Sequence, residues 1–137
     1  RLTTNALVAC DALVSPLECK INNFRNFKVF GQFLEEFKRD MHLSPESIFV
    51  PTRYTHNRRL SLEIKEWYHQ NVAGCTEQGI PESVLGEEAT ALHLTFMEHA
   101  PGKPAAQDMR RLLTEIHQRL APLGAQVSTG EAAWPLA

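Results

Sequence analysis

The chain has 137 residues, of which 43% are hydrophobic and 22% are charged, and its net charge is −2. This length suits one domain with a modest core, and this composition excludes a chain that is disordered throughout. The charge balance excludes a general attraction to nucleic acid, so any such binding must depend on a local basic patch.

The first predicted elements are a helix, a strand and a longer helix. Residues 2–10 (LTTNALVAC) place apolar side chains on one helical face, and residues 12–18 (ALVSPLE) form a short apolar run typical of a strand. Pro16 is expected to mark the end of that strand, because proline cannot donate a ladder hydrogen bond. Residues 21–41 repeat apolar side chains at intervals of three and four, which predicts a helix that ends at residues 42–45.

The middle of the chain continues this alternation. Residues 47–51 (SIFVP) predict a second strand, residues 52–57 its loop, and residues 58–72 a second amphipathic helix. Residues 75–83 have only a weak strand pattern and contain turn residues. Residues 84–94 predict a short helix.

The last third ends in the clearest helix. Residues 94–104 predict a short strand followed by a loop rich in proline and glycine, and residues 104–124 predict a helix with Pro104 in its first turn. The apolar stripe of that helix is formed by Met109, Leu112, Leu113, Ile116 and Leu120. Residues 125–137 carry little pattern and are expected to be a loose tail.

This order of short apolar strands and amphipathic helices predicts an α/β fold with a mostly parallel sheet covered by helices on both faces. In such sheets ligands bind at the carboxyl ends of the strands. The polar stretch that follows residues 47–51 therefore falls at a candidate ligand-binding edge.

Most familiar catalytic motifs are missing from the sequence. It contains neither GxxxxGK[ST] nor GxGxxG, and its scattered histidines form no HExxH motif, so neither a phosphate loop nor a metal site is predicted. Cys10, Cys19 and Cys75 are odd in number and include no CxxC pair, which favours a reducing cytosol over disulfides. Cys10 and Cys75 lie in apolar or turn contexts and are interpreted as inert thiols rather than nucleophiles. Glu87 and Glu88 are interpreted as an exposed helical face. No apolar run reaches the roughly 18–20 residues of a membrane span.

Arg53, Arg58 and Arg59 are the most informative polar residues. Guanidinium groups at the carboxyl edge of a parallel sheet suit phosphate, either of a nucleotide or of a DNA backbone. The alternative is that Arg58 and Arg59 are solvated residues of a first helical turn, paired with Glu63 or Glu66. The sequence leaves both interpretations open.

The phenylalanines between Phe24 and Phe37 form the second notable pattern. Their spacing predicts that they line the core side of the long helix. Because this is a large number of phenylalanine side chains for one helix, part of this stripe could instead form a subunit interface.

Residues 2–20 (LTTNALVACDALVSPLECK) are similar to the helix and strand that follow the Walker B region in the ParA family of partition ATPases. FVPTRYTHNRRLSLEI (residues 49–64) looks like the next strand, loop and helix. The run from Gly79 to Ile116, which begins GIPESV, resembles the closing part of the domain. The resemblance extends over roughly residues 2–120.

The resemblance implies a P-loop-type ATPase that binds ATP and Mg²⁺, dimerises, binds DNA without sequence preference and responds to a ParB-like partner. It implies a cytoplasmic, nucleoid-associated protein of bacterial or archaeal type. Residues 1–124 would form the C-terminal part of the nucleoside-triphosphatase domain, followed by the tail 125–137. The chain starts at Arg1, as if within a domain, and lacks Walker A and B, so we expect it to be inactive alone.

The resemblance also assigns nucleotide-binding positions. Thr52 and Arg53 fall where related ATPases place residues near the base. The loop that borders the adenine corresponds to Ile80, Pro81, Glu82 and Ser83.

The DNA-binding positions match the family less well. Arg58 and Arg59 lie beside the position of a DNA-binding arginine in relatives, but Asn57 occupies that position itself. Glu82 and Leu85 stand where basic residues are frequent. DNA contact is therefore expected through Arg58, Arg59 and nearby lysines, or to be weaker. Two other functions stay open: a non-enzymatic interaction or dimerisation module derived from this fold, and a nucleic-acid-binding domain without nucleotide.

Overall fold

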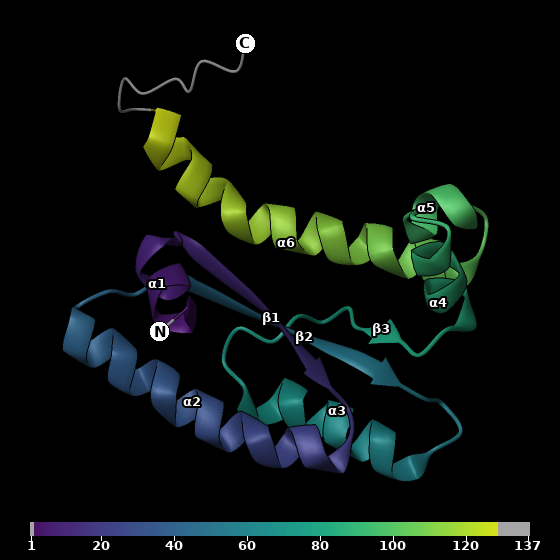
Figure 1. Ribbon diagram of the computed structural model, residues 1–137, viewed down its shortest axis with the longest axis horizontal. Helices are drawn as coiled ribbons and strands as arrows, with labels where there is room; N and C mark the ends of the chain where they lie inside the picture. Colours follow the sequence, from purple (N-terminus) through teal and green to yellow (C-terminus); the bar gives the residue numbers. More distant parts are fainter. Residues whose placement is uncertain (1, 129–137) are drawn as a thin grey trace.

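The computed structural model describes the backbone of residues 2–128 and the side chains of residues 2–124. Helices and strands alternate along the first half of the chain, and three helices follow the last strand (Figure 1). The described elements are α1 (Leu2–Ala9), β1 (Ala12–Glu18), α2 (Ile21–Met41), β2 (Glu46–Tyr54), α3 (Arg59–Asn71), β3 (Ile80–Pro81), α4 (Val84–Ala91), α5 (Phe96–His99) and α6 (Pro104–Ser128).

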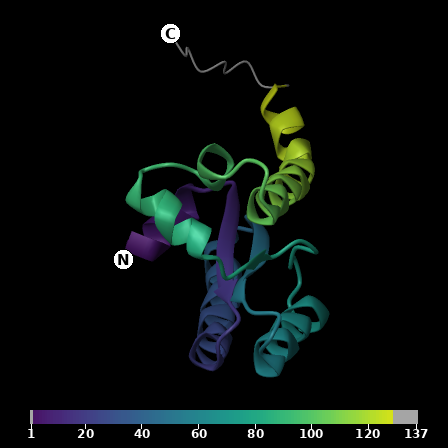
Figure 2. The ribbon, with the colours of Figure 1, turned by 90° about the vertical axis from the view of Figure 1, so that its right-hand side faces the viewer.

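The strands form one parallel sheet in the order β1-β2-β3. β1 and β2 pair without interruption, from Ala12 opposite Glu46 to Glu18 opposite Thr52. Figures 1 and 2 show α2 and α3 on one face of the sheet and α6 on the other. The predicted α/β fold with a parallel sheet is therefore confirmed.

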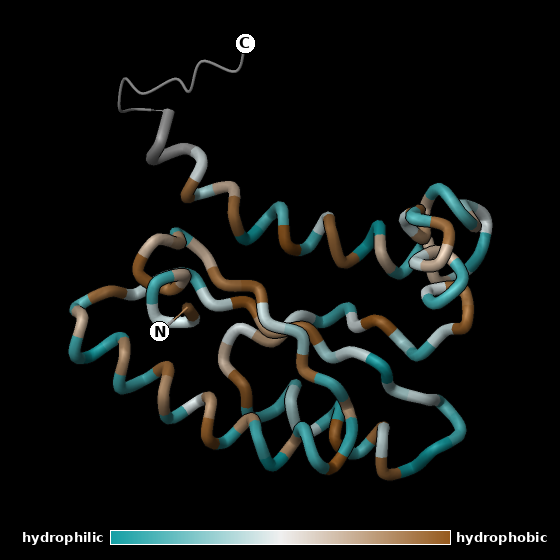
Figure 3. Tube along the Cα trace, viewed as in Figure 1, coloured by the Kyte–Doolittle hydropathy of each residue, from teal (hydrophilic) through white to brown (hydrophobic). Residues whose placement is uncertain are grey.

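The central strand β2 supplies a core to each face of the sheet. Side chains alternate along a strand, so Phe49 and its neighbours Ile48 and Val50 point to opposite faces. Phe49 belongs to the core beneath α2 and α3, whereas Ile48 and Val50 pack with Leu112 of α6. Figure 3 shows the matching pattern: hydrophobic residues concentrate in the strands and recur along α2 and α6.

The long helix α2 begins and ends as the sequence predicts. It stops where His42 adopts a left-handed conformation with φ 53°. Its aromatic stripe is mainly core: the rings of Phe27 and Phe49 lie 5.9 Å apart between centroids, and Phe37 is buried. Val29 and Phe33 remain on the outer side, with 69% and 37% of their surface exposed.

Helix α6 covers the opposite face of the sheet. Four of its predicted stripe residues pack in that core, namely Met109, Leu112, Ile116 and Leu120. Leu113 is wrongly placed in the predicted stripe, since it is 46% exposed. The helix continues to Ser128, past the predicted end at residue 124. Residues 129–137 of the predicted tail lie outside the described residues.

Pro16 lies inside β1 instead of ending it. The Cys19 N–H donates to the Thr52 carbonyl over 2.9 Å, and the Glu46 N–H donates to the Asp11 carbonyl over 3.1 Å. Bonding to a given neighbour uses every second residue of a parallel strand, so the odd-numbered residues of β1 bond to β2. Pro16 faces the outer edge of the described sheet, where its missing N–H breaks no bond between strands.

The strand predicted within residues 94–104 is wrong, because a helical turn, α5, forms there. The Thr95 hydroxyl accepts a hydrogen bond from the Glu98 N–H over 3.2 Å, and the Glu98 carboxylate accepts one from the Thr95 N–H over 2.8 Å. This reciprocal capping box starts a helix despite the apolar residues around it.

Candidate functional site

The carboxyl ends of the three strands meet at one edge of the sheet. Glu18 of β1 lies opposite Thr52 of β2, and Tyr54 of β2 pairs with Pro81 of β3. The predicted nucleotide-binding segments around residues 52–53 and 80–83 are thus neighbours in space, although almost thirty residues separate them in sequence. This is the edge at which parallel sheets bind ligands.

Arg53 has an unusual backbone conformation. Its φ is 54°, and the pairing of β2 with β3 shifts register between Thr52 and Tyr54. The loop predicted from residue 52 is therefore wrong: β2 continues through this irregularity to Tyr54. A residue other than glycine in this region costs on the order of 1–3 kcal/mol, and such positions concentrate at functional sites.

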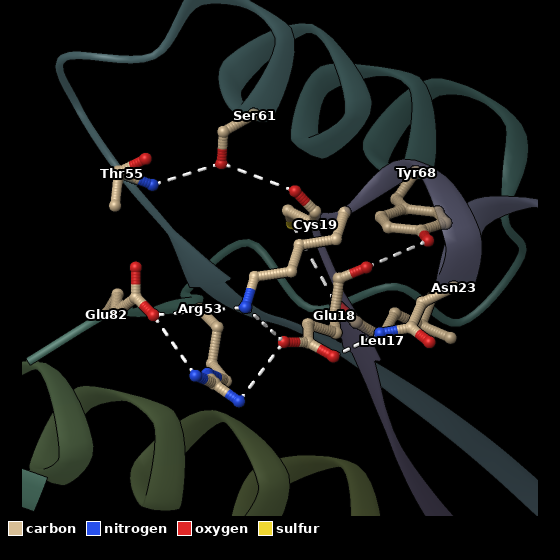
Figure 4. Close-up of polar contacts among 10 residues, drawn as sticks. Leu17, Glu18, Cys19, Asn23, Arg53, Thr55, Ser61, Tyr68 and Glu82 are labelled. Atoms are coloured by element: carbon tan, nitrogen blue, oxygen red, sulfur yellow. Dashed lines mark hydrogen bonds and ion pairs between the residues drawn. The ribbon is translucent and has the colours of Figure 1, made fainter.

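The Arg53 side chain links the ends of β1 and β3. Its Nη1 lies 3.2 Å from Oε1 of Glu18, and its Nη2 lies 3.1 Å from Oε1 of Glu82. Lys20 joins the same cluster, with its Nζ 3.0 Å from Glu18 and 4.0 Å from Glu82. Figure 4 shows the guanidinium between the two carboxylates. Because the Arg53 side chain is 53% exposed, each pair contributes only about 0–1 kcal/mol.

Glu18 is held in its charged form. The hydrogen bond from Lys20 lowers the pKa of this carboxyl most, and burial, the next largest cause, raises it. The charges of Lys20 and Arg53 and a hydrogen bond from Asn23 lower the pKa further, so the net direction is downward. The Glu18 carbonyl also accepts a hydrogen bond from the Tyr68 hydroxyl over 3.3 Å. The site is thereby anchored to the core beneath α3.

A cavity of about 580 Å³ opens beside this cluster, between β3 and the helices α4 and α5. It is lined by Arg53, Ile80, Pro81, Glu82, Ser83, Gly86, Glu87, Thr90, Ala91 and Phe96. Five of the six residues that the resemblance assigns to the nucleotide thus share one cavity. The sixth, Thr52, lines a neighbouring cavity of about 470 Å³ against α2 instead.

The loop after β3 is fixed by its own hydrogen bonds. The Glu82 N–H donates to the Tyr54 carbonyl over 2.9 Å. The Ser83 hydroxyl accepts a hydrogen bond from the Leu85 N–H over 3.2 Å and so caps α4. Before β3, a Cβ at Gly79 would lie 2.7 Å from the Pro51 carbonyl oxygen, so only glycine fits there. The cavity wall is held in place by the backbone as well as by the ion pairs.

The predicted DNA-binding arginines differ from each other. Arg59 pairs with Glu63 one helical turn later, over 2.7 Å, and its side chain is 92% exposed. This matches the alternative of a solvated helical face. Arg58 is the N-cap residue of α3, is exposed, and has no ion pair among residues 2–124. Asn57 beside it is also exposed.

The cysteines behave as core residues. Burial is the main cause that raises the pKa of both Cys19 and Cys75 to about 11. Cys19 is only 2% exposed. At neutral pH these thiols stay protonated and are poor nucleophiles, as predicted for Cys75.

Sequence reasoning missed several residues of this site. Glu18 ends β1 and Lys20 follows it, just as Arg53 lies near the end of β2, so the rule about strand ends applied to them equally. Phe96 was assigned to a strand, although the spacing of Thr95 and Glu98 is a helix-start signal. Nothing in the sequence marks Gly86 as a site residue, because its role depends on contact with the ring of Phe96, ten residues later.

Comparison with known proteins leaves the family of this chain open. Within the part of the chain that the structure describes, no helix is long and apolar enough to cross a bilayer. Within the same part, no three His, Cys, Asp or Glu side chains are grouped so that they could hold a metal ion. No protein-family model matches the sequence, and no curated protein matches it.

Proposed function

We propose that this chain is the C-terminal part of a ParA-like partition ATPase and that its cavity between β3 and α4 binds the adenine base. The observation that carries this proposal is the convergence of Arg53, Pro81, Glu82 and Ser83 on one cavity at the carboxyl ends of parallel strands. The family resemblance points to the same residues independently of the geometry.

The chemistry of the cavity favours a base over a phosphate. Ile80, Pro81 and Phe96 supply apolar surface, and the remaining lining residues include hydroxyls that can accept or donate hydrogen bonds. The lining contains one cation, Arg53, against the carboxylates of Glu82 and Glu87. Arg53 is already paired with Glu82. An uncharged aromatic heterocycle fits this balance, whereas a triphosphate would meet net negative charge.

The proposed contribution of this chain is binding and orientation. Phosphoryl transfer needs a phosphate-binding lysine and Mg²⁺ ligands, and the sequence has no P-loop motif. Among the described residues no three His, Cys, Asp or Glu side chains are grouped around a possible metal position, so no step through the metal is assigned to them. We expect nucleotide binding without turnover by the chain alone. Magnesium-dependent hydrolysis by it would contradict this view.

The test is calorimetric titration of adenosine and MgATP into the chain and into the natural gene product that carries it. Ala91→Trp fills the cavity from an exposed position of α4 and should weaken binding at least tenfold, about 1.4 kcal/mol. Val84→Trp is the matched control on the same helix, because Val84 is 69% exposed and does not line the cavity. Equal affinities for both variants would contradict the proposed site.

For non-specific DNA binding we assign the main role to Arg58. It is exposed and unpaired within the described residues, whereas Arg59 is engaged with Glu63. Arg58→Ala should weaken DNA binding and reduce the steepness of its salt dependence by about one unit, as for one lost phosphate contact. Arg59→Ala should change both less. If neither variant alters binding, both arginines are solvated residues without this role.

The interaction module is the second candidate, and one observation favours it. Val29 and Phe33 form an exposed apolar pair on α2, which is unusual for a helix that already buries an aromatic stripe. This module predicts a dimer that does not depend on nucleotide and that Phe33→Glu dissociates. In sedimentation experiments a monomer at all concentrations would exclude it.

A further inference from the structure

Helix α5 has a defined position despite its length of four residues. The capping box of Thr95 and Glu98 fixes its start. The ring nitrogen Nε2 of His99 lies 3.1 Å from the Glu88 carboxylate and ties α5 to α4. The Leu94 N–H also donates to a carbonyl of α4, that of Ala89, over 2.9 Å. Figures 1 and 2 show the two helices packed together at the end of α6.

This arrangement brings the ring of Phe96 directly against the backbone of α4 at Gly86. A Cβ built on Gly86 would lie 2.8 Å from Cζ of Phe96 and 3.5 Å from its Cε1. Real Cβ atoms do not approach a ring so closely, so the position of the ring depends on glycine at residue 86. Phe96 and Gly86 both line the cavity of about 580 Å³.

Phe96 is the aromatic residue among those that line this cavity. A ring at a base-binding site provides a stacking surface that does not depend on hydrogen-bond pattern, worth about 1–3 kcal/mol per base. Phe96 also lies outside the segments that the family resemblance assigned to the nucleotide, which were residues 52–53 and 80–83. It reaches the same cavity only because α5 folds back on α4.

We propose that Phe96 is the base-stacking and specificity-determining residue of this site, positioned by Gly86 and by the capped turn α5. This inference rests on the proposed nucleotide-binding function and deepens it. The stacked group is a neutral aromatic heterocycle of purine size, and its contact is independent of the phosphates. Loss of the ring must therefore weaken adenosine and ATP by the same factor.

The experiment compares four variants by calorimetry, with thermal unfolding to verify that each is folded. Phe96→Leu keeps an apolar side chain beside Gly86 but removes the aromatic face, and should weaken both adenosine and MgATP about 5- to 150-fold. Phe96→Trp should retain or improve binding. Gly86→Ala leaves Phe96 itself unchanged but should still weaken binding, because the new methyl group displaces the ring. Met97→Ala, in the same turn but not lining the cavity, is the control.

The outcomes separate this inference from the function on which it rests. If the wild-type protein binds adenosine and ATP, and Phe96→Leu binds them equally well, the role of Phe96 is wrong and the site stands. If Phe96→Leu weakens ATP but not adenosine, the residue acts on the phosphates and stacking is wrong. If the wild-type protein binds neither ligand, the proposed function and this inference both fall.

Discussion

The two halves of β2 differ in what surrounds them. Ile48 and Phe49 are buried on opposite faces of the sheet, under α6 and under α2 and α3 respectively. Four residues later Arg53 has a left-handed backbone and a half-exposed side chain held by two carboxylates. One strand therefore carries both buried core residues and a strained, polar segment.

Stability and the proposed ligand binding are located in different halves of β2. Apolar burial at the start of β2 is worth several kcal/mol per large side chain. The ion pairs at its end contribute little, and the backbone of Arg53 is unfavourable. We infer that the first half holds the fold and that the second half is kept for a ligand.

The largest expected effect is at Phe49. Its ring lies 5.9 Å from that of Phe27 between centroids and is 5% exposed. Phe49→Ala should lower the free energy of unfolding by about 3–5 kcal/mol, measured by urea denaturation. A loss below about 1 kcal/mol would show that this half of β2 is not the principal source of stability.

Arg119 of α6 should have the next largest effect. Its guanidinium donates to the carbonyls of Gly74 and Cys75 over 2.6 and 3.0 Å, which holds the loop beside Phe49. Arg119→Ala leaves these acceptors without that partner and should cost about 1–3 kcal/mol. The control is Arg111→Ala, which removes a pair of 3.6 Å at a 68% exposed side chain. Its expected cost is within about 0.5 kcal/mol, and equal costs would contradict the assignment.

Arg53→Gly should separate stability from binding. Glycine relieves the left-handed backbone at φ 54° while the variant loses two exposed ion pairs. Because these effects oppose each other, the free energy of unfolding should stay within about 1 kcal/mol of the wild type. Nucleotide affinity should fall, because the side chain that links the strand ends is gone. Unchanged affinity would show that the strain serves no ligand.

The raised pKa of Cys19 and Cys75 should slow their reaction near neutral pH and should affect stability only at high pH. With a pKa of about 11, Cys19 and Cys75 are thiolates in roughly one molecule per thousand at pH 8. Iodoacetamide at that pH should leave both unmodified in the native protein and label them in urea. Burial of the protonated Cys19 thiol raises its pKa from 9.0 to about 11. The free energy of unfolding that this burial provides is therefore complete below about pH 9 and decreases as the pH rises toward 11. Rapid native labelling of Cys19 would show that the core opens beside the site.

The elements with long, regular patterns could be predicted from the sequence. α2 has the predicted bounds because its apolar residues recur over five turns, and β1 has them because its short apolar run is bounded on both sides. Pro16 within β1 could not be understood without knowing that this strand is at the edge of the described sheet. The apolar pattern around Phe96 predicted a strand, which is wrong, because the capping box of Thr95 and Glu98 starts the helical turn α5 there.

The site was predictable in outline but not in detail. The segments around Arg53 and Pro81 were identified, and the structure brings them together. The pairing of Arg53 with Glu18 and Glu82 was not predictable, because these residues lie far apart in sequence and meet only where the strand ends come together. The positive φ of Arg53 has no sequence signal either, because arginine does not favour that conformation.

The most direct test of the central claim is to map adenosine and MgATP onto the natural gene product by NMR of its backbone amides. The account predicts shifts at Arg53, Glu82, Gly86 and Phe96, which surround one cavity. Lys38 lies in the last turn of α2 and should not shift, because that helix ends on the opposite side of Figure 1 from α4 and α5. An absence of shifts at the four cavity residues under saturating nucleotide, or shifts confined to other parts of the molecule, would contradict the account.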